Sequence, residues 1–148
     1  MQERFQTFTI LIMRLNRCIH KIKTAEMAEF DLKSPHVSCL YYLYKSGAMT
    51  AKELCDVCHE DKGAMSRSLD YLEQRGFILC DSAAKKRYRA PLTLTDEGRR
   101  IGASIAQKVD SILDKASEGL DEESRTTMYK SLALIDENLQ KICEEYEG

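Results

Sequence analysis

Residues 50–95 read TAKELCDVCHEDKGAMSRSLDYLEQRGFILCDSAAKKRYRAPLTLT, and this stretch decides the fold. It predicts two short helices in close succession, a strand, a polar loop rich in lysine and arginine, and a returning strand. Such an order can place the second helix in the major groove of DNA with a charged hairpin beside it. Because the stretch lies in the middle of a small chain, we expect the flanking helices to form a dimer.

Local signals set the ends of the two short helices. Thr50 and Glu53 have the spacing of a capping box, in which the hydroxyl and the carboxylate each bind an amide of the other residue. Asp61 is a suitable N-cap for the second helix. That helix is expected to end at Arg75 and Gly76, since a basic last turn followed by glycine is a common helix stop.

Similar signals mark the flanking elements. Ser34 and Pro35 are expected to be the N-cap and first residue of a helix that ends near residue 47. Thr95 begins a long helix and Asp121 begins the last one. Pro91 places the returning strand at a sheet edge or at a bulge, because proline cannot donate to a strand ladder. The inner face of the helix after Pro35 is expected to carry Val37, Leu40, Tyr41 and Tyr44.

The composition is that of an ordinary globular chain. Its 148 residues fit one domain, with 43% hydrophobic and 31% charged residues. We find no apolar run near the roughly 18 residues of a membrane span and no export signal, so we expect a cytoplasmic protein that does not enter membranes. Reduced thiols are therefore expected at all six cysteines: Cys18, Cys39, Cys55, Cys58, Cys80 and Cys143.

The net charge of −2 conceals an uneven distribution. Residues 62–100 contain nine Lys or Arg and five Asp or Glu, whereas residues 118–148 contain three and nine. The local positive excess coincides with the predicted helix pair and hairpin, as an electrostatic footprint for nucleic acid requires. A solvated surface with charges clustered by chance is the simpler alternative.

Both ends of the chain carry an apolar stripe with helical spacing. The first comprises Phe5, Phe8, Ile12, Leu15, Ile19 and Ile22, and the second Met128, Leu132, Ile135, Leu139, Ile142 and Tyr146. Steps that alternate between three and four residues are typical of helices that pack in coiled-coil fashion. In a chain this short, we expect the stripes to be buried against each other and against a second subunit.

The second helix of the central pair is amphipathic. Met65, Leu69 and Leu72 form its apolar face. The outward face near its N-terminus is then expected to contact DNA through Lys62, Gly63, Ser66 and Arg67. Thr50 and the loop residues Lys85, Lys86, Arg87 and Arg89 complete the predicted DNA-binding set. A helical hairpin that binds nothing is the alternative interpretation, because helix-turn-helix geometry alone is a weak signal.

These residues resemble the MarR family of bacterial transcription regulators. The resemblance is carried by Thr50-x-x-Glu53-Leu54, by Ser66-Arg67-x-Leu69-Asp70-x-Leu72-Glu73-x-Arg75-Gly76-Phe77, by the basic hairpin and by Leu92-x-Leu94-Thr95-x-x-Gly98. It implies a winged-helix homodimer that binds a pseudo-palindromic operator, usually as a repressor. Lys62, Gly63, Ser66 and Arg67 match the family's recognition helix, and residues 85–89 match its wing.

The wing departs from the family pattern. Family members commonly carry an aspartate and, two residues later, an arginine at the wing tip. The corresponding positions here hold Lys86 and Tyr88, while Arg87 and Arg89 flank the expected arginine. The resemblance therefore does not tell which arginine enters the minor groove.

Cys55, Cys58 and His59 form a Cys-x-x-Cys-His string. A structural role in the helix-turn-helix core, a metal site and a redox site all remain open, although a metal site needs about four ligands. In the family register, Cys55 and Cys58 occupy positions that are usually alanine and buried leucine. Cys18 lies among basic residues that could lower its pKa, or it could be a packed thiol. We predict no metal and no cofactor.

These observations lead to one fold and two competing functions. We expect a mainly α fold with a small β-hairpin, formed by a single domain over 1–148. Its DNA-binding lobe would span 34–95, with the helix-turn-helix at about 50–75 and the wing at about 77–94, while 1–30 and 96–148 would be dimerisation helices. The leading hypothesis is a homodimeric repressor that binds double-stranded DNA. An unknown small-molecule or redox signal would release it from the DNA.

The alternative is a winged-helix protein–protein interaction module without sequence-specific DNA binding. An enzyme is not expected, because the sequence has no glycine-rich phosphate loop, no nucleophile–base constellation and no metal set. A sensor pocket, if one exists, should lie where the first, second and fifth helices meet the DNA-binding lobe. Tyr41, Tyr42, Tyr44 and His36 could line it, but the ligand remains unknown.

Overall fold

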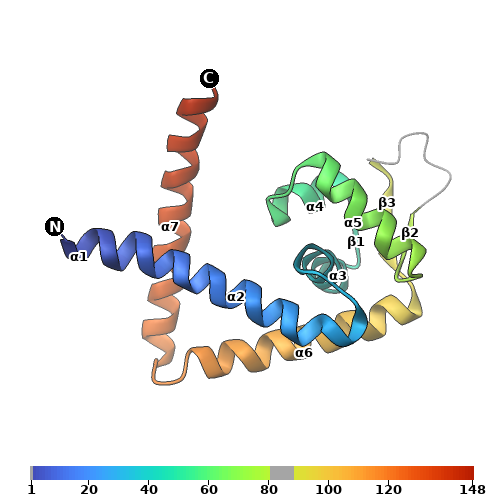
Figure 1. The fold of residues 1–148 in the computed structure, drawn as a ribbon, viewed down its shortest axis with the longest axis horizontal. Helices are drawn as coiled ribbons and strands as arrows, with labels where there is room; N and C mark the ends of the chain where they lie inside the picture. The colour runs from blue at the N-terminus through green and yellow to red at the C-terminus, as the bar shows by residue number, and fades with distance from the viewer. Residues whose placement is uncertain (1, 81–88) are drawn as a thin grey trace. The chain divides into compact units, whose positions relative to one another are not determined.

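The computed structural model describes residues 2–80 and 89–148 (Figure 1). The chain forms two compact units, Met1–Val109 and Asp110–Gly148. The first contains every strand and all helices up to most of α6, and the second contains the end of α6 and α7. The fold is that of a winged helix with long terminal helices, as the sequence predicted.

The long N-terminal helix is continuous through three segments: α1 (Gln2–Arg4), the π-helical η1 (Phe5–Ile10) and α2 (Leu11–Met27). A short 3₁₀ turn, η2 (Ala28–Phe30), follows. The remaining elements are α3 (Ser34–Ser46), β1 (Ala48–Thr50), α4 (Ala51–Cys58), α5 (Lys62–Gln74), β2 (Ile78–Cys80), β3 (Pro91–Leu94), α6 (Asp96–Ala116) and α7 (Glu122–Glu147).

A three-stranded antiparallel sheet replaces the simple hairpin expected from the sequence. Its order is β1-β3-β2, so the returning strand β3 is central and not at an edge. Pro91 is tolerated because it is the first residue of β3: it pairs with Thr50 of β1, and among the described residues the pairing with β2 runs from Leu92 to Leu94. The sequence predicted that this strand lies at a sheet edge or at a bulge, and the edge position was wrong because β3 lies between β1 and β2.

One apolar core unites the elements of the first unit. It contains Leu40 and Leu43 from α3, Leu54 from α4, Leu72 from α5 and Ile105 from α6, each with a side chain that is fully inaccessible to solvent. Strands β2 and β3 add one face of the small sheet to the same core. Through this core, the buried face of α5 packs against α3 and against the sheet.

The predicted helix starts are confirmed for α4, α5, α6 and α7. Thr50 Oγ1 accepts from the Glu53 amide at 3.1 Å, and Glu53 Oε2 accepts from the Thr50 amide at 2.7 Å, which is the capping box. Asp61 and Asp121 cap α5 and α7.

Two expectations for α3 need correction. Its N-cap is Lys33, one residue before Ser34, and the Lys33 amide donates to Nδ1 of His36 at 3.0 Å. Tyr44 was expected on the inner face, but its side chain is 36% exposed. Gly102 of α6 lies against the Tyr44 Cβ, so Tyr44 forms the rim of the core and not its interior.

The junction between β2, β3 and α6 depends on a close backbone approach. Thr95 caps α6 by accepting from the Gly98 amide at 3.0 Å, and its hydroxyl donates to the Gly76 carbonyl at 2.6 Å. The Thr95 amide donates to the Phe77 carbonyl at 3.1 Å. A Cβ at position 98 would lie 1.9 Å from that carbonyl oxygen, so only glycine fits there.

Across the residues that the structure describes, every helix is too short or too polar to cross a lipid bilayer.

The first prediction concerns this junction. Gly98→Ala should lower the free energy of unfolding by several kcal/mol, about as much as severe overpacking does, because the Phe77 backbone cannot move without breaking its bond to Thr95. Urea titration monitored by circular dichroism measures the change. Gly63→Ala is the matched control, since its Cβ would meet no backbone atom but only two side-chain ends, Asp61 Oδ1 at 3.3 Å and an Arg67 guanidinium nitrogen at 3.5 Å. Equal stabilities of the two variants would contradict the prediction.

Candidate nucleic-acid interface

Helices α4 and α5 form a helix-turn-helix joined by a tight turn. His59 adopts a left-handed conformation, with φ of 52°, and its amide donates to the Cys55 carbonyl. The chain then reverses into Asp61, whose Oδ1 accepts from the Ala64 amide at 2.8 Å. The first turn of α5 is thereby closed by a carboxylate, which also interacts favourably with the positive end of the helix dipole.

Packing separates α5 into a buried and an outward face. Met65, Leu69 and Leu72 are at most 4% exposed, as the sequence predicted. The four residues predicted to contact DNA from this helix are all exposed: Lys62, Gly63, Ser66 and Arg67. They lie on the first turns of α5, which is the part of a recognition helix that reaches base edges.

Gly63 creates space at the start of α5. A Cβ there would lie 3.3 Å from Asp61 Oδ1 and 3.5 Å from a terminal guanidinium nitrogen of Arg67. The Arg67 side chain therefore folds back toward the first turn, close to the capping carboxylate. This brings a guanidinium and the helix N-terminus to the same patch of surface, and both attract phosphate.

Thr50 occupies a different position from the other predicted residues. It is half-buried at the start of α4, where its hydroxyl oxygen already accepts the Glu53 amide. The hydroxyl hydrogen can still donate outward, so contact with a phosphate oxygen is compatible with the cap.

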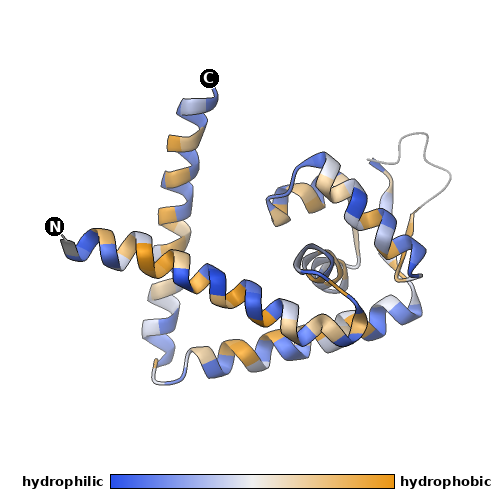
Figure 2. Cartoon of the chain, in the orientation of Figure 1, coloured by the Kyte–Doolittle hydropathy of each residue, from blue (hydrophilic) through white to orange (hydrophobic). Residues whose placement is uncertain are grey.

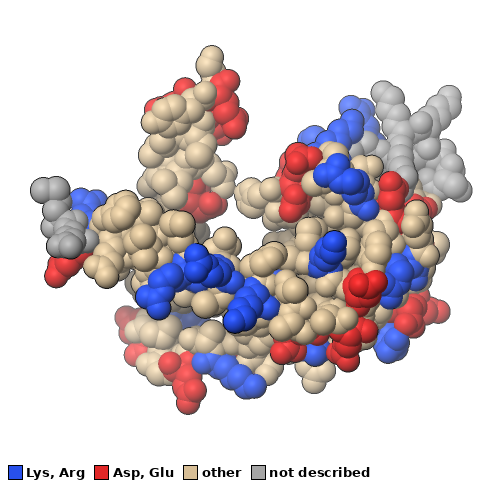
Figure 3. Space-filling view, in the orientation of Figure 1, with Lys and Arg blue, Asp and Glu red and all other residues tan. Residues whose placement is uncertain are grey.

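The wing is described only in part. Arg89 is exposed, directly before the buried Ala90 and strand β3. Lys85, Lys86 and Arg87, together with Tyr88, lie outside the described residues. On the face shown in Figure 3, lysine and arginine side chains lie over the helix-turn-helix, interspersed with acidic ones, and others gather over α2.

The C-terminal end of α5 is held by a clasp that sequence reasoning missed. Arg75 donates to the Phe30 carbonyl at 3.1 Å and to the Tyr71 hydroxyl at 2.7 Å, and its guanidinium lies 3.6 Å from the Asp31 carboxylate. The Tyr71 hydroxyl donates to the Asp31 carbonyl. These bonds tie the recognition helix to the turn that follows the long N-terminal helix.

His36 supports this clasp from α3. Its ring stacks on Tyr71 with centroids 4.3 Å apart and planes inclined by 13°. Burial lowers the pKa of His36, the charges of Lys33 and Arg75 lower it further, and Asp31 opposes them. The neutral ring is required because Nδ1 accepts the Lys33 amide.

The second prediction follows from this depressed pKa. Below the ordinary histidine pKa of about 6.5, the unfolded chain takes up the proton more readily than the folded one. The contribution of neutral His36 to the free energy of unfolding is therefore fully present above that pH. It is lost as the pH drops toward the pKa of His36 in the folded protein. In His36→Asn, whose amide oxygen can still accept the Lys33 amide, urea titrations between about pH 7 and pH 5 should show a weaker loss. His59→Asn, at an exposed left-handed position, should keep the wild-type dependence; an unchanged dependence in His36→Asn would contradict the assignment.

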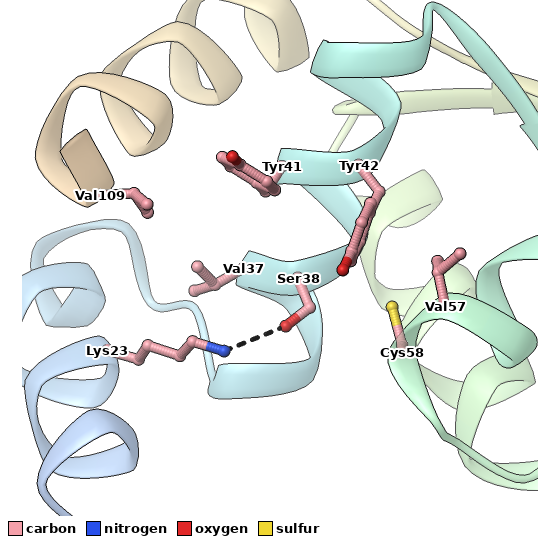
Figure 4. A pocket seen from close by; sticks show the side chains of 8 residues that line it. All are labelled: Lys23, Val37, Ser38, Tyr41, Tyr42, Val57, Cys58 and Val109. Atoms are coloured by element: carbon pink, nitrogen blue, oxygen red, sulfur yellow. Dashed lines mark hydrogen bonds between the residues drawn. The ribbon is translucent and has the colours of Figure 1, made fainter. Parts of the chain in front are cut away.

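A cavity of about 320 Å³ lies beside the helix-turn-helix, within the first unit (Figure 4). It is lined by Lys23, Val37, Ser38, Tyr41, Tyr42, Val57, Cys58 and Val109. Tyr41 and Tyr42 are therefore at the cavity where a sensor pocket was expected. His36 and Tyr44 do not line it, because His36 stacks on Tyr71 and Tyr44 contacts Gly102.

The cysteines occupy distinct environments. Cys55 is buried and Cys58 is half-buried, and both pack with the helix-turn-helix core, which favours the structural interpretation of the Cys-x-x-Cys-His string. Among the residues that the structure describes, no three His, Cys, Asp or Glu side chains gather as metal ligands would. Cys18 is exposed on α2, so its thiol is not packed against the described residues of the first unit.

The described residues form a winged helix with an exposed N-terminal part of α5 and long terminal helices, and comparison with known proteins shows what this chain is similar to. Residues 30–87 match the sequence profile of the MarR family. An uncharacterized HTH-type transcriptional regulator, YfiV of Bacillus subtilis, is 21% identical over 121 residues, which cover 82% of this chain and 76% of that protein.

Solved structures give the same result for the fold. A MarR protein from Peptoclostridium difficile matches with a TM-score of 0.81 at 16% identity, covering 90% of this chain and 87% of that one. The S. aureus MepR–DNA complex matches with a TM-score of 0.78 at 20% identity, covering 90% and 97%. The matched residues 30–87 include most of the stretch 50–98 whose motif resembles the MarR family.

Proposed function

We propose that this protein is a homodimeric, DNA-binding transcriptional regulator that acts as a repressor in the cytoplasm. The observation that carries the proposal is the first turns of α5, where Lys62, Ser66 and Arg67 are exposed while Met65 and Leu69 anchor the helix from behind. A rigidly supported helix with exposed basic and hydroxyl groups at its N-terminus suits the major groove. MepR, which shares the fold, has been solved as a complex with DNA.

The terminal helices support the homodimer. In the first unit, the predicted stripe along η1 and α2 is exposed, with values from 38% at Ile22 to 63% at Phe5. In the second unit, most of the α7 stripe is exposed as well, including Met128, Leu132 and Leu139. Figure 2 shows these apolar residues recurring along both helices. So much exposed apolar surface in periodic array is typical of an interaction face.

A dimer would present two copies of α5 to one duplex. Half-sites one helical turn apart, about 10 base pairs, are the expected spacing for such an arrangement. An effector that binds one separation of the two lobes more tightly than another would shift the dimer toward that separation. Its affinity for the operator would change as a result.

The third prediction tests DNA binding. Gel-shift titrations on the DNA upstream of the protein's own gene, at several salt concentrations, should show a steep loss of affinity with salt. Arg67→Ala should weaken binding at least several-fold. If Arg67 contacts phosphate, each lost contact should lower the slope of log K against log salt by about 0.9, and if it contacts guanine, sequence discrimination should fall by about 1–3 kcal/mol.

Lys141→Ala is the control for this series, since it removes a positive charge from the acidic C-terminal segment. It should leave both affinity and slope unchanged. Binding without sequence preference, or Arg67→Ala behaving as the control does, would contradict the proposal and favour the protein–protein interaction module.

The fourth prediction tests the dimer. Leu15, 49% exposed in the single chain, should be buried in the assembly. Leu15→Glu would place a charge in that interface and should shift the protein to monomer in sedimentation equilibrium, with loss of operator binding. Asn16→Glu, an exposed polar position next to it on the helix, should remain dimeric. A monomeric wild type, or a dimeric Leu15→Glu variant, would refute the arrangement.

A further inference from the structure

The end of α5 that lies farthest from the predicted DNA contacts is held by polar bonds to one turn. That turn spans residues 28–31, between the long N-terminal helix and α3. Arg75 donates to the Phe30 carbonyl at 3.1 Å, and the Tyr71 hydroxyl donates to the Asp31 carbonyl. The Tyr71 hydroxyl also accepts from Arg75 at 2.7 Å, so one hydroxyl serves both halves of the clasp.

The turn is itself fixed to the rest of the first unit. Leu32, directly after it, is buried, and its amide donates to the Met27 carbonyl at 3.3 Å. From α6, the Lys108 ammonium lies 3.0 Å from a carboxylate oxygen of Glu26 and 3.6 Å from one of Glu29. A side chain that binds the carbonyls of this turn is therefore bound to the end of the long N-terminal helix and, through Lys108, to α6.

Apolar packing alone leaves the C-terminal turn of α5 weakly fixed. The buried residues of the helix end at Leu72, and positions 73–75 are exposed. The next buried residue is Phe77, which lies beyond the end of the helix. The Arg75 guanidinium lies over the Phe77 ring, 5.2 Å from its centroid, and reaches the turn from there. The clasp thus holds the helix end at the point where the core no longer supports it.

A small tilt at this end of α5 has a large effect at the other. The helix rises about 1.5 Å for each residue, so Lys62 lies about 20 Å along the axis from Arg75. A tilt of about 5° around the clasp therefore displaces the first turn by about 2 Å. Hydrogen bonds to base edges tolerate less than this, because they weaken steeply away from their preferred distances and angles.

We propose that Tyr71 and Arg75 are positioning residues for operator recognition. They fix the tilt of α5 relative to the long N-terminal helix, whose apolar stripe is the proposed dimer interface. They thereby set the half-site spacing that a dimer reads. Both act through the position of α5 and not by contact with DNA, since their polar groups already bind the turn. The inference rests on the proposed function, because it requires a dimer that binds two half-sites.

One half-site and two half-sites place different demands on the clasp. A dimer can meet a single half-site by rotating as a whole, so the tilt of α5 within the protomer matters little. Two half-sites on one duplex fix both copies of α5 at once, and the second contact gains from being intramolecular only if the separation is right. Loosening the clasp should therefore weaken binding to two half-sites and spare binding to one.

The fifth prediction compares affinities for three DNA duplexes. The first is the segment upstream of the protein's own gene that the wild type protects, and the second has one half-site scrambled. The third has about five base pairs, half a helical turn, inserted between the half-sites. Tyr71→Phe keeps the ring that stacks on His36 and removes both hydroxyl bonds. It should lower affinity for the first duplex at least several-fold, leave the second within about twofold of wild type, and reduce the penalty of the insertion.

Arg75→Met should behave in the same way. It removes a positive charge, yet the slope of log K against log salt on the single half-site should stay that of wild type, because Arg75 contacts no phosphate. The double variant should be little weaker than the weaker single variant, since both substitutions break the same clasp. Tyr44→Phe is the control. It removes a hydroxyl from the rim of the core, where Tyr44 contacts Gly102, and should match wild type on all three duplexes.

A residue that only stabilised the fold would lower the folded fraction, and with it the affinity for every duplex by the same factor. Equal losses on one and two half-sites would therefore overturn the inference. So would a smaller salt slope in Arg75→Met, or a Tyr71→Phe variant that behaves as Tyr44→Phe does. A wild type that binds no duplex, or binds one and two half-sites equally, would refute the proposed function and this inference with it.

Discussion

The packing of α5 against the core is the constraint on which the rest of this structure depends. Three apolar side chains spaced along one face, Met65, Leu69 and Leu72, are almost completely withdrawn from water, and their burial fixes the rotation of the helix about its axis. A rotation that exposed them would cost about 1.5–3 kcal/mol for each side chain. The outward position of Ser66 and Arg67 is therefore a consequence of the core and needs no ligand to maintain it.

The C-terminal end of α5 is tied to distant parts of the first unit by polar contacts. At its C-terminus, Arg75 and Tyr71 bind the turn at Phe30 and Asp31, and the strand beyond it is joined to α6 through Thr95. These bonds link α5 to the long N-terminal helix and to α6 without involving Lys62, Ser66 or Arg67. A change in either helix can consequently alter the position of α5, which is the physical requirement for regulation at a distance.

The apolar surface of the chain is unevenly distributed between its core and its terminal helices. The core of the first unit runs from Met27 to Ala106, and beyond it the apolar residues of α2 and α7 are largely exposed. A helix with an exposed apolar stripe gains little stability alone, since most helical stability in proteins comes from packing of such a face. The same reasoning separates Cys58 from Cys55, because partial burial in a cavity leaves a thiol accessible while full burial makes it part of the core.

The sequence by itself determined the helix starts at Thr50, Asp61 and Asp121 and the buried face of α5, because caps and periodicity act over a few residues. Only the tertiary structure decided that β3 is central, with Pro91 at its start, and that Arg75 reaches Phe30. Strand order and contacts between residues 45 positions apart depend on the complete packing of the chain, which no local pattern encodes. The cavity at Cys58 belongs to this second group, since four separate helices must meet to enclose it.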